Sequence, residues 1–260
     1  MSLGAAPLRI SSRDNPLLQR LRRLAQDGGA YRREGQVWIE GEHLCAALRA
    51  RGAAAVQAVV SEAAWDQPRL RELAGWAARV VLVPEALFKG LSTLGSPAPL
   101  GFVIDLPATA TLQPGVGGVV LDRVQDPGNA GSILRSAAAF GFGQVLALKG
   151  SVALWSPKVL RAGMGAHFGL RLVEGLDEAA LDGLGLPLLA TSSHEGVPLP
   201  EAILPHPCAW VLGHEGQGVG ADLLARCAQR LRIPQPGGEE SLNVAAAAAV
   251  CLYESLRQRS

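Results

Sequence analysis

The 260-residue sequence has few of the features that mark secreted, metal-binding or membrane proteins. Its four cysteines lie far apart in apolar surroundings, and none forms a Cys-x-x-Cys pair. This pattern favours reduced, buried thiols over disulfides or a metal cluster. The five histidines lack metal-ligand spacing, no run of 18 apolar residues could cross a membrane, and the first residues lack the blocks of a signal peptide. We therefore expect a cytoplasmic protein without a bound metal or a membrane partner.

Two nucleotide-binding signatures and one hydrolase signature are also missing. The phosphate loop needs G-x-x-x-x-G-K followed by Ser or Thr, and the chain has no Lys-Ser or Lys-Thr pair. The dinucleotide fingerprint needs G-x-G-x-x-G, whereas Gly216, Gly218 and Gly220 give G-x-G-x-G. No serine lies in a recognisable nucleophile elbow. These absences argue against a hydrolase triad and against a nucleotide-dependent oxidoreductase, the rival that the glycine-rich segment alone would favour.

Neither sign of charge is in clear excess, since the net charge is +1, but the charges are unevenly distributed along the chain. Residues 1–33, here called the basic arm, carry seven arginines and two aspartates, a net charge of +5, so the remainder sums to −4. A basic arm on a slightly acidic body favours electrostatic contact with a polyanion. The alternative is a solvated helix face, because arginine is a good helix former.

The hydrophobic pattern predicts two successive α/β units. In the first, helices are expected at residues 14–26, 42–51, 68–78 and 84–88, and strands at 37–39, 55–60, 80–83 and 101–105. In the second, strands are expected at 118–121, 144–148, 186–191, 209–212 and 230–233, and helices at 130–140, 157–162, 221–227 and 242–257. The strands of the second unit are continuously apolar, which is typical of a parallel sheet covered on both faces.

These units predict four parts of the chain. After the basic arm come a first α/β domain at residues 34–106, a linker at 107–115 with Pro, Thr and Gly character, and a second α/β domain at 116–260. Ligands of open α/β sheets bind at the carboxyl ends of the strands. Three such ends in the second domain are rich in glycine and polar residues, and they are the candidate site.

The first of these segments is residues 122–135. A strand runs into a Pro-Gly turn, and Asn129 is expected to cap the helix that carries Arg135. Free N–H groups at a helix start suit an anion, and Arg135 adds a permanent cation with a forked set of donors. The alternative is an ordinary strand–turn–helix corner whose arginine is solvated.

The other two segments are residues 213–220 and 233–244. Glycines in the former let a ligand approach the backbone closely, although a glycine-rich turn without a ligand has the same pattern. In the latter, Ser241 is expected to cap the final helix. That helix is apolar on nearly every face, so we expect it to be buried within the domain or against a second subunit.

Taken together, the three segments resemble the SpoU/TrmH family of RNA 2′-O-ribose methyltransferases, in the SPOUT superfamily. The family's three motifs are N-x-G-x-x-x-R, G-x-E-G-x-G and I-P…S-L-N-V. They are matched by Asn129, Gly131 and Arg135, by Gly213, Glu215, Gly216 and Gly218, and by Ile233, Pro234, Ser241, Leu242, Asn243 and Val244. Residues 10–24 and 34–48 resemble the substrate-binding domain of a subgroup that includes ribosomal RNA enzymes. Two positions depart from the pattern: His214, where Asn or Ser is expected, and Gln235, often an apolar position.

The resemblance implies a fold and a cofactor. The C-terminal domain would be a parallel-sheet SPOUT domain with a trefoil knot, next to a smaller N-terminal α/β domain that binds the RNA substrate. A homodimer would form across the knotted region. S-adenosylmethionine would bind in the knot loops, and the residues implied as its binding site are Thr191, Leu212, Gly213, Gly218, Ile233 and Leu242.

The resemblance also implies the catalytic residues. Arg135 is the catalytic residue by position, and Asn129, Glu215, Ser241 and Asn243 would position Arg135, the RNA and the cofactor. Arginine normally stays protonated, so we favour electrostatic stabilisation of the 2′-oxygen by Arg135 over a role as general base. The substrate would be structured RNA and not DNA, because the acceptor is the 2′-hydroxyl. Ribosomal RNA of the large subunit (23S) is favoured; a transfer RNA enzyme and a non-catalytic RNA-binding or assembly protein are the alternatives.

Overall fold

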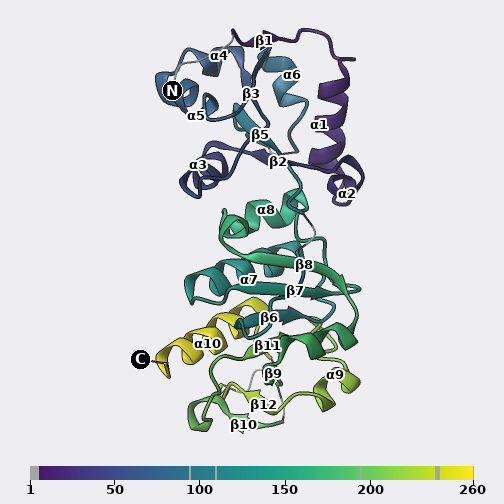
Figure 1. Ribbon diagram of the computed structural model, residues 1–260, viewed down its shortest axis with the longest axis vertical. Helices are drawn as coiled ribbons and strands as arrows, with labels where there is room; N and C mark the ends of the chain where they lie inside the picture. Colours follow the sequence, from purple (N-terminus) through teal and green to yellow (C-terminus); the bar gives the residue numbers. More distant parts are fainter. Residues whose placement is uncertain (1–5, 94, 109, 194, 238–240, 260) are drawn as a thin grey trace. The chain divides into compact units, whose positions relative to one another are not determined.

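The computed structural model describes residues 6–93, 95–108, 110–193, 195–237 and 241–259. The chain divides into two compact units, each with its own sheet (Figure 1). Unit 1 comprises Met1–Ala108 and Trp155–Phe168, and unit 2 comprises Thr109–Leu154 and Gly169–Ser260. The predicted α/β class is confirmed in both. Residues 155–168, which the sequence placed with the second domain, group with unit 1.

Unit 1 is built on a mixed five-stranded sheet of order β1-β4-β3-β5-β2, in which β5 runs antiparallel to β3 and β2. Its strands are β1 (Leu8–Arg9), β2 (Gln36–Glu40), β3 (Gln57–Ser61), β4 (Val80–Val83) and β5 (Leu100–Asp105). Its helices are α1 (Pro16–Gln26), α2 (Ala30–Glu34), α3 (Glu42–Ala50), α4 (Glu62–Trp65), α5 (Pro68–Ala74), α6 (Glu85–Lys89) and α8 (Pro157–Gly163). The structure therefore adds β1, α2 and α4 to the predicted elements.

The basic arm is part of the core of unit 1. Helix α1 begins at Pro16, two residues after the predicted start, because Asn15 accepts a hydrogen bond from the Leu17 N–H and Pro16 fits the first turn. Leu18, Leu21 and Leu24 of this helix are buried. Strand β1 pairs with β4. Removing residues 1–33 would therefore expose the core of unit 1 as well as remove its charges.

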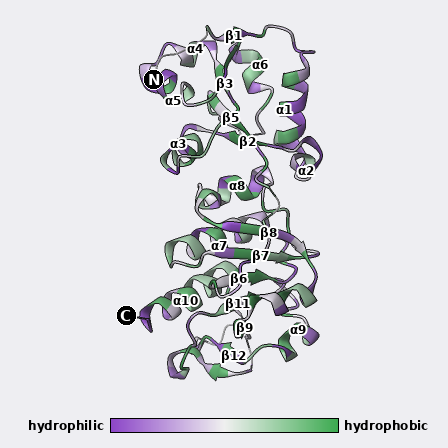
Figure 2. Ribbon diagram, viewed as in Figure 1, coloured by the Kyte–Doolittle hydropathy of each residue, from purple (hydrophilic) through white to green (hydrophobic). Residues whose placement is uncertain are grey.

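Unit 2 is built on a seven-stranded sheet of order β10-β12-β9-β11-β6-β7-β8, and every neighbouring pair is parallel. Its strands are β6 (Gly118–Leu121), β7 (Gln144–Leu148), β8 (Arg171–Leu176), β9 (Leu188–Thr191), β10 (Val197–Pro198), β11 (Ala209–Leu212) and β12 (Gln229–Arg232). The predicted parallel sheet is confirmed. Figure 2 shows hydrophobic residues concentrated on its central strands β6 and β11, whose residues are all buried.

The helices of unit 2 are α7 (Pro127–Ala139), α9 (Ala221–Ala225) and α10 (Val244–Arg257), with 3-10 turns η2 (Glu178–Leu184) and η3 (Leu199–Glu201); a further turn, η1 (Ala166–Gly169), follows α8. Helix α10 packs mainly on α7 and also contacts β11. The buried Trp210 indole N–H donates to the Ser255 hydroxyl at 2.8 Å, which fixes the end of α10 to the sheet. In the described part of the chain, none of the helices combines the length and apolar character needed to span a bilayer.

Both predicted helix caps in unit 2 are wrong. Helix α7 begins three residues early at Pro127, and Asp126 caps it by accepting from the Asn129 N–H at 2.8 Å. Proline suits the first helical position, so the acidic residue directly before it becomes the cap. Helix α10 is capped by Asn243 and not by Ser241, because the Asn243 Oδ1 accepts from Ala245 N–H at 2.9 Å and from Ala246 N–H at 3.2 Å. The Asn129 side chain therefore does not cap α7, and the Asn243 side chain caps α10.

Helix α10 buries one face only, so the prediction of all-round burial within the domain is wrong. Ala248, Cys251 and Leu252 are buried, whereas Val250 is 42% and Tyr253 54% exposed. The four cysteines are free thiols; three are buried as predicted, whereas Cys227 is only partly buried. Burial raises the pKa of the Cys251 thiol to about 12, which leaves it protonated and unreactive at neutral pH.

Candidate active site

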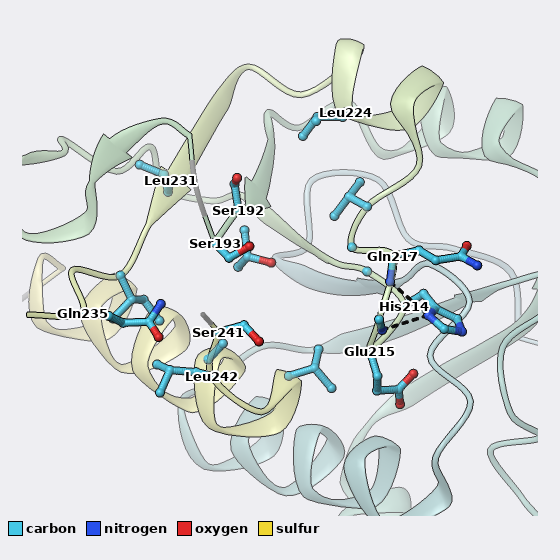
Figure 3. Close-up of a pocket in the computed structure, with 18 residues that line it drawn as sticks. Ser192, Ser193, His214, Glu215, Gln217, Leu224, Leu231, Gln235, Ser241 and Leu242 are labelled. Carbon is cyan, nitrogen blue, oxygen red and sulfur yellow. Dashed lines mark hydrogen bonds between the residues drawn. The ribbon is translucent and has the colours of Figure 1, made fainter. Parts of the chain in front are cut away.

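A pocket of about 410 Å³ opens at the carboxyl ends of β9, β11 and β12, beside the start of α10. Its size lies in the range of small-molecule sites. Figure 3 shows the side chains that surround it. The lining residues are Thr191, Ser192, Ser193, Gly213, His214, Glu215, Gly216, Gln217, Gly218, Val219, Leu224, Leu231, Ile233, Gln235, Ser241, Leu242, Val244 and Ala247. Segments that are distant in the sequence therefore share one cavity, as their positions at strand ends predict.

One wall of the pocket is the glycine-rich loop after β11. A Cβ atom on Gly213 would lie 2.1 Å from the carbonyl carbon of Gly218, so only glycine fits there. Backbone bonds of 3.0 and 2.9 Å pair His214 with Gly218, whose φ of +68° also suits glycine. The His214 Nδ1 accepts from the N–H groups of Gly216 at 3.0 Å and Gln217 at 3.2 Å. His214, one of the two departures from the family pattern, thus closes the loop on itself.

Three side chains from the three predicted segments form a continuous hydrogen-bond relay. The Asn129 Nδ2 donates to the Glu215 Oε1 at 3.1 Å, and the Asn243 Nδ2 donates to the Asn129 Oδ1 at 2.9 Å. The Asn243 Oδ1 in turn accepts from the first N–H groups of α10. This relay joins residues 86 and 114 positions apart in the sequence.

The charge of Glu215 sets the direction of the relay. Burial raises the pKa of Glu215, but hydrogen bonds from Asn129 and from the N–H groups of Asp126 at 3.1 Å and Gln125 at 3.3 Å outweigh burial. The pKa therefore lies below its ordinary value, and the ionised carboxylate only accepts hydrogen bonds. Asn129 must turn its NH₂ group to Glu215, which leaves its oxygen for Asn243. Glu215 is thus an orienting anion at neutral pH and not a proton donor.

A second polar group, the ion pair of Asp122 and Arg123, holds the glycine-rich loop through hydrogen bonds. Asp122 is 3% exposed and accepts from the Gly220 N–H at 2.7 Å and from Arg123 at 2.8 and 2.9 Å. Arg123 also donates to the Gln217 side chain at 3.0 Å and to the Gly218 carbonyl at 3.3 Å. Burial raises the pKa of Asp122, but Arg123 and the Gly220 N–H together hold it below its ordinary value.

Sequence reasoning missed this ion pair. The available signal was the charged pair Asp122-Arg123 directly after an apolar strand. Arg123 makes these contacts from a left-handed backbone conformation, with a φ of 58°. Residues other than glycine rarely adopt that conformation. The pair ties the end of β6 to the loop after β11, and so it fixes one wall of the pocket.

The structure brings most of the predicted site residues together. Of the predicted cofactor residues, five line the pocket: Thr191, Gly213, Gly218, Ile233 and Leu242. Leu212 is the fully buried last residue of β11 and does not appear among the described lining residues. Residues 238–240 of the third segment lie outside the described residues.

The predicted catalytic residues fall into three groups. Glu215 and Ser241 line the pocket, and Asn129 and Asn243 extend from it through the relay. Arg135 lies on α7, exposed to solvent. Within the described part of the chain its guanidinium has no hydrogen-bond or ion-pair partner. It is therefore a cation available to a ligand, unlike Arg123.

Comparison with known proteins relates this geometry to methyltransferases. The family model described as the SpoU rRNA Methylase family matches residues 118–253. An uncharacterised tRNA/rRNA methyltransferase from Synechocystis sp. is 35% identical, covering 96% of this chain and 94% of that protein. The 23S rRNA (guanosine(2553)-2′-O)-methyltransferase RlmP of Bacillus subtilis is 31% identical, covering 83% of this chain and 86% of that protein.

One similar solved structure contains a bound cofactor. The SpoU methyltransferase AviRb from Streptomyces viridochromogenes, in complex with the cofactor AdoMet, matches with a TM-score of 0.82 at 25% identity. The match covers 94% of this chain and 98% of that chain. It extends over both units, so the similarity is not limited to the sheet that carries the pocket.

Proposed function

The chain belongs to the SpoU rRNA methylase family, and from this membership we propose that it methylates a ribose 2′-hydroxyl of ribosomal RNA with S-adenosylmethionine as the methyl donor. The observation that carries the proposal is the relay of Glu215, Asn129 and Asn243. It joins the three segments of the family pattern at a pocket of suitable size. The alternative of a vestigial, non-catalytic protein has less support, because the site's polar groups are intact.

The residues of the pocket fit the proposed cofactor. Gly213 and Gly218 bring backbone close to the cavity, and apolar side chains of Leu231, Ile233 and Leu242 can flank a flat ring. These groups, with Thr191, would hold the cofactor. When bound, S-adenosylmethionine supplies an electrophilic methyl group.

We assign the chemistry at the acceptor oxygen to Arg135. A ribose hydroxyl is a poor nucleophile until it loses its proton, and a fixed cation stabilises the negative charge that develops on the oxygen. The Arg135 guanidinium is exposed and unpaired in the described part of the chain, so it is free to take this role. It stays protonated at neutral pH, so the proton itself would leave to solvent or to a neighbouring RNA phosphate. Asn129, Glu215, Ser241 and Asn243 would hold the RNA and the cofactor in register.

The choice of ribosomal RNA rests on the relatives. The Bacillus subtilis relative that covers 83% of this chain carries a 23S rRNA ribose activity in its name. Unit 1, where the basic arm contributes exposed arginines, would provide RNA contacts outside the active site. We propose a cytoplasmic location, because ribosomal RNA of bacteria such as Bacillus subtilis, the source of one relative, lies in the cytoplasm. A DNA substrate would lack the acceptor hydroxyl.

We also propose a homodimer formed through α10. Val250 and Tyr253 are large exposed apolar side chains on this helix, and the Tyr253 ring meets Phe140 of α7 edge-on at 5.8 Å. An exposed apolar face of this kind favours a protein partner. The trefoil knot is proposed from the family membership alone. Sedimentation at micromolar concentration should give twice the mass of the chain, and a monomer would contradict the dimer.

The experiment that tests the function is a map of 2′-O-methyl sites in cellular RNA, made with and without the gene. We expect one ribosomal site to disappear and to return when the wild-type gene is restored. Restoring the Arg135→Ala variant should leave the site unmethylated. Loss of a methyl group from a transfer RNA instead would show that transfer RNA, and not ribosomal RNA, is the substrate. An unchanged map would contradict the proposed methyltransferase activity.

A further inference from the structure

The imidazole ring of His214 folds the glycine-rich loop from within. Its Nδ1 accepts from the N–H groups of Gly216 at 3.0 Å and Gln217 at 3.2 Å. Figure 3 shows both bonds as dashed lines beside the cavity. Every residue from Gly213 to Val219 lines the pocket. The two bonds to the ring therefore shape a whole wall of the site.

These bonds also define the protonation state in which His214 can act. An imidazole nitrogen accepts a hydrogen bond only when it carries no proton, so a neutral ring that accepts at Nδ1 has its proton on Nε2. A proton added at Nδ1 would turn this acceptor into a donor and point it at two other donors. Both bonds would then break. His214 can hold the loop only as a neutral imidazole.

The composition of the loop makes this support important for binding. Glycine occupies three of the positions 213–219, and glycine loses more conformational freedom on ordering than any other residue. A loop that is ordered before the ligand arrives opposes binding less than one that must be ordered on binding. The ring bonds the turn that the backbone pairing of His214 with Gly218 closes. That turn also carries Glu215 of the relay, so its shape affects both the pocket and the relay.

The charged groups next to the loop do not titrate in the range of imidazole. They are Asp122 and Arg123 after β6, Asp126 before α7 and, within the loop, Glu215. Burial raises the pKa of Asp122 and of Glu215, but hydrogen bonds hold both pKa values below the ordinary ones. Carboxyl groups ordinarily titrate about two pH units below imidazole, and arginine stays protonated. Among these groups and His214, only the histidine has a side chain of the type that changes charge between about pH 5.5 and about pH 8.

We propose that His214 is a positioning residue for the cofactor, holding the loop in its binding shape as neutral imidazole and releasing it on protonation. Affinity for the cofactor then decreases in acid. An asparagine at this position would also offer an acceptor to the N–H group two residues on, but its carboxamide does not titrate. The pH dependence is thus a property of the histidine. The proposal rests on the proposed function, since it takes S-adenosylmethionine as the ligand.

The test is calorimetric titration of the purified full-length protein with S-adenosylhomocysteine, the product form of the cofactor. Wild type and His214→Asn are compared at about pH 8 and about pH 5.5, on either side of the ordinary imidazole pKa. The readout is the ratio of the two affinities, because titration of the ligand's own groups affects both proteins equally. The ratio of wild-type to variant affinity should fall roughly two- to tenfold at the lower pH, the range that one hydrogen bond contributes.

Two further variants complete the comparison. His214→Ala has no acceptor, so it should bind more weakly than His214→Asn by the same factor at both pH values. His43→Asn makes the same substitution at an exposed histidine of α3 in unit 1 and should keep the wild-type pH dependence.

The outcomes separate the role of His214 from the proposed function. If the ring only stabilised the fold, the free energy of unfolding would depend on pH and the affinity ratio would not. A constant ratio would overturn the role of His214 and leave the proposed function intact. No binding of S-adenosylhomocysteine to the wild type at either pH would overturn both.

Discussion

The two units of the chain use their polar residues in different ways. In unit 2, a buried aspartate and the relay connect separate strand ends through hydrogen bonds of 2.7 to 3.1 Å. In unit 1, ion pairs such as Arg33–Asp27 and Arg69–Glu42 lie on the surface, with exposed arginine side chains. Preorganised polar groups suit chemistry, and exposed charges suit contact with a polyanion. Exposed ion pairs such as Lys149–Asp177 also occur in unit 2, so the preorganised groups are what distinguishes it, and we propose that unit 2 performs the reaction while unit 1 contributes contacts to the RNA.

The largest effect should come from Arg135 in unit 2. Arg135→Ala should lower methyl transfer at least about a hundredfold, the scale of losing a key electrostatic group. Cofactor affinity should stay unchanged, because Arg135 does not line the pocket described above. Single-turnover rates and calorimetric titration measure the two quantities. Lys149→Ala, which removes an exposed cation paired with Asp177 in the same unit, is the control and should react normally. Near-normal turnover in Arg135→Ala would contradict the assignment.

The next largest effect should come from the polarity of the relay. Asn129→Asp keeps the size of the side chain but places a second carboxylate beside the ionised Glu215. The relay is exposed to solvent, so the variant should lose only about 0.2–1 kcal/mol of unfolding free energy at neutral pH, the scale of an exposed charge–charge interaction. It should recover part of this as the pH falls and one of the two carboxylates takes a proton. Urea unfolding at several pH values measures the change, with Asn129→Ala as the uncharged control. An Asp variant as stable as wild type at pH 7 would show that Glu215 does not orient the relay.

A smaller effect is expected for single arginines in unit 1. Because Leu18, Leu21 and Leu24 are buried, point substitutions test the basic arm more cleanly than its deletion. Arg13 is exposed and its guanidinium has no partner in the described part of the chain, whereas Arg33 is paired with Asp27. Arg13→Ala should reduce the slope of log affinity for RNA against log salt by about 0.7–0.9, the value for one lost phosphate contact. Arg33→Ala should change the slope less. Equal, negligible changes would make the arm a solvated helix face.

The smallest effect compares one aspartate from each unit. Arg33 lowers the pKa of Asp27 in unit 1, while the pKa of Asp122 in unit 2 lies below its ordinary value despite burial, because of Arg123 and the Gly220 N–H. A lowered pKa adds stability above the ordinary carboxyl value, and this stability is lost as the pH falls through the lowered one. At neutral pH, Asp122→Asn should therefore destabilise the protein more than Asp27→Asn, and both differences should shrink in acid. Unfolding curves between pH 3 and pH 7, a range set by the ordinary aspartate pKa of about 4, measure them.

The sequence predicted the apolar elements well and the polar connections poorly. Strands 80–83, 118–121, 144–148 and 209–212 have the predicted bounds, because continuous apolar runs define buried strands. Strands β8 and β10 were missed, since β8 is buried only in part and β10 has two residues. The caps were misassigned because several residues near each helix start could serve, and the backbone path selects among them.

In the candidate site, too, the segments were predictable and the polar contacts between them were not. The three segments were identifiable from their residues, and their proximity followed from strand ends in a parallel sheet: two of them line the pocket, and residues 122–135 join it through Asn129. The relay through Asn129 could not be predicted, because it depends on which amide faces which across 86 and 114 residues. The role of Arg123 depends on a left-handed backbone conformation that its neighbours in sequence do not reveal.

The central claim is that unit 2 transfers a methyl group to a ribose oxygen and not to a base. The most direct measurement uses purified protein, ribosomal RNA and S-adenosylmethionine with a labelled methyl group, followed by alkaline hydrolysis of the RNA. A methylated 2′-oxygen cannot attack the adjacent phosphate, so the label should appear in an alkali-stable dinucleotide, and Arg135→Ala should abolish it. Label in mononucleotides, which would indicate a methylated base, or no label at all would contradict the account.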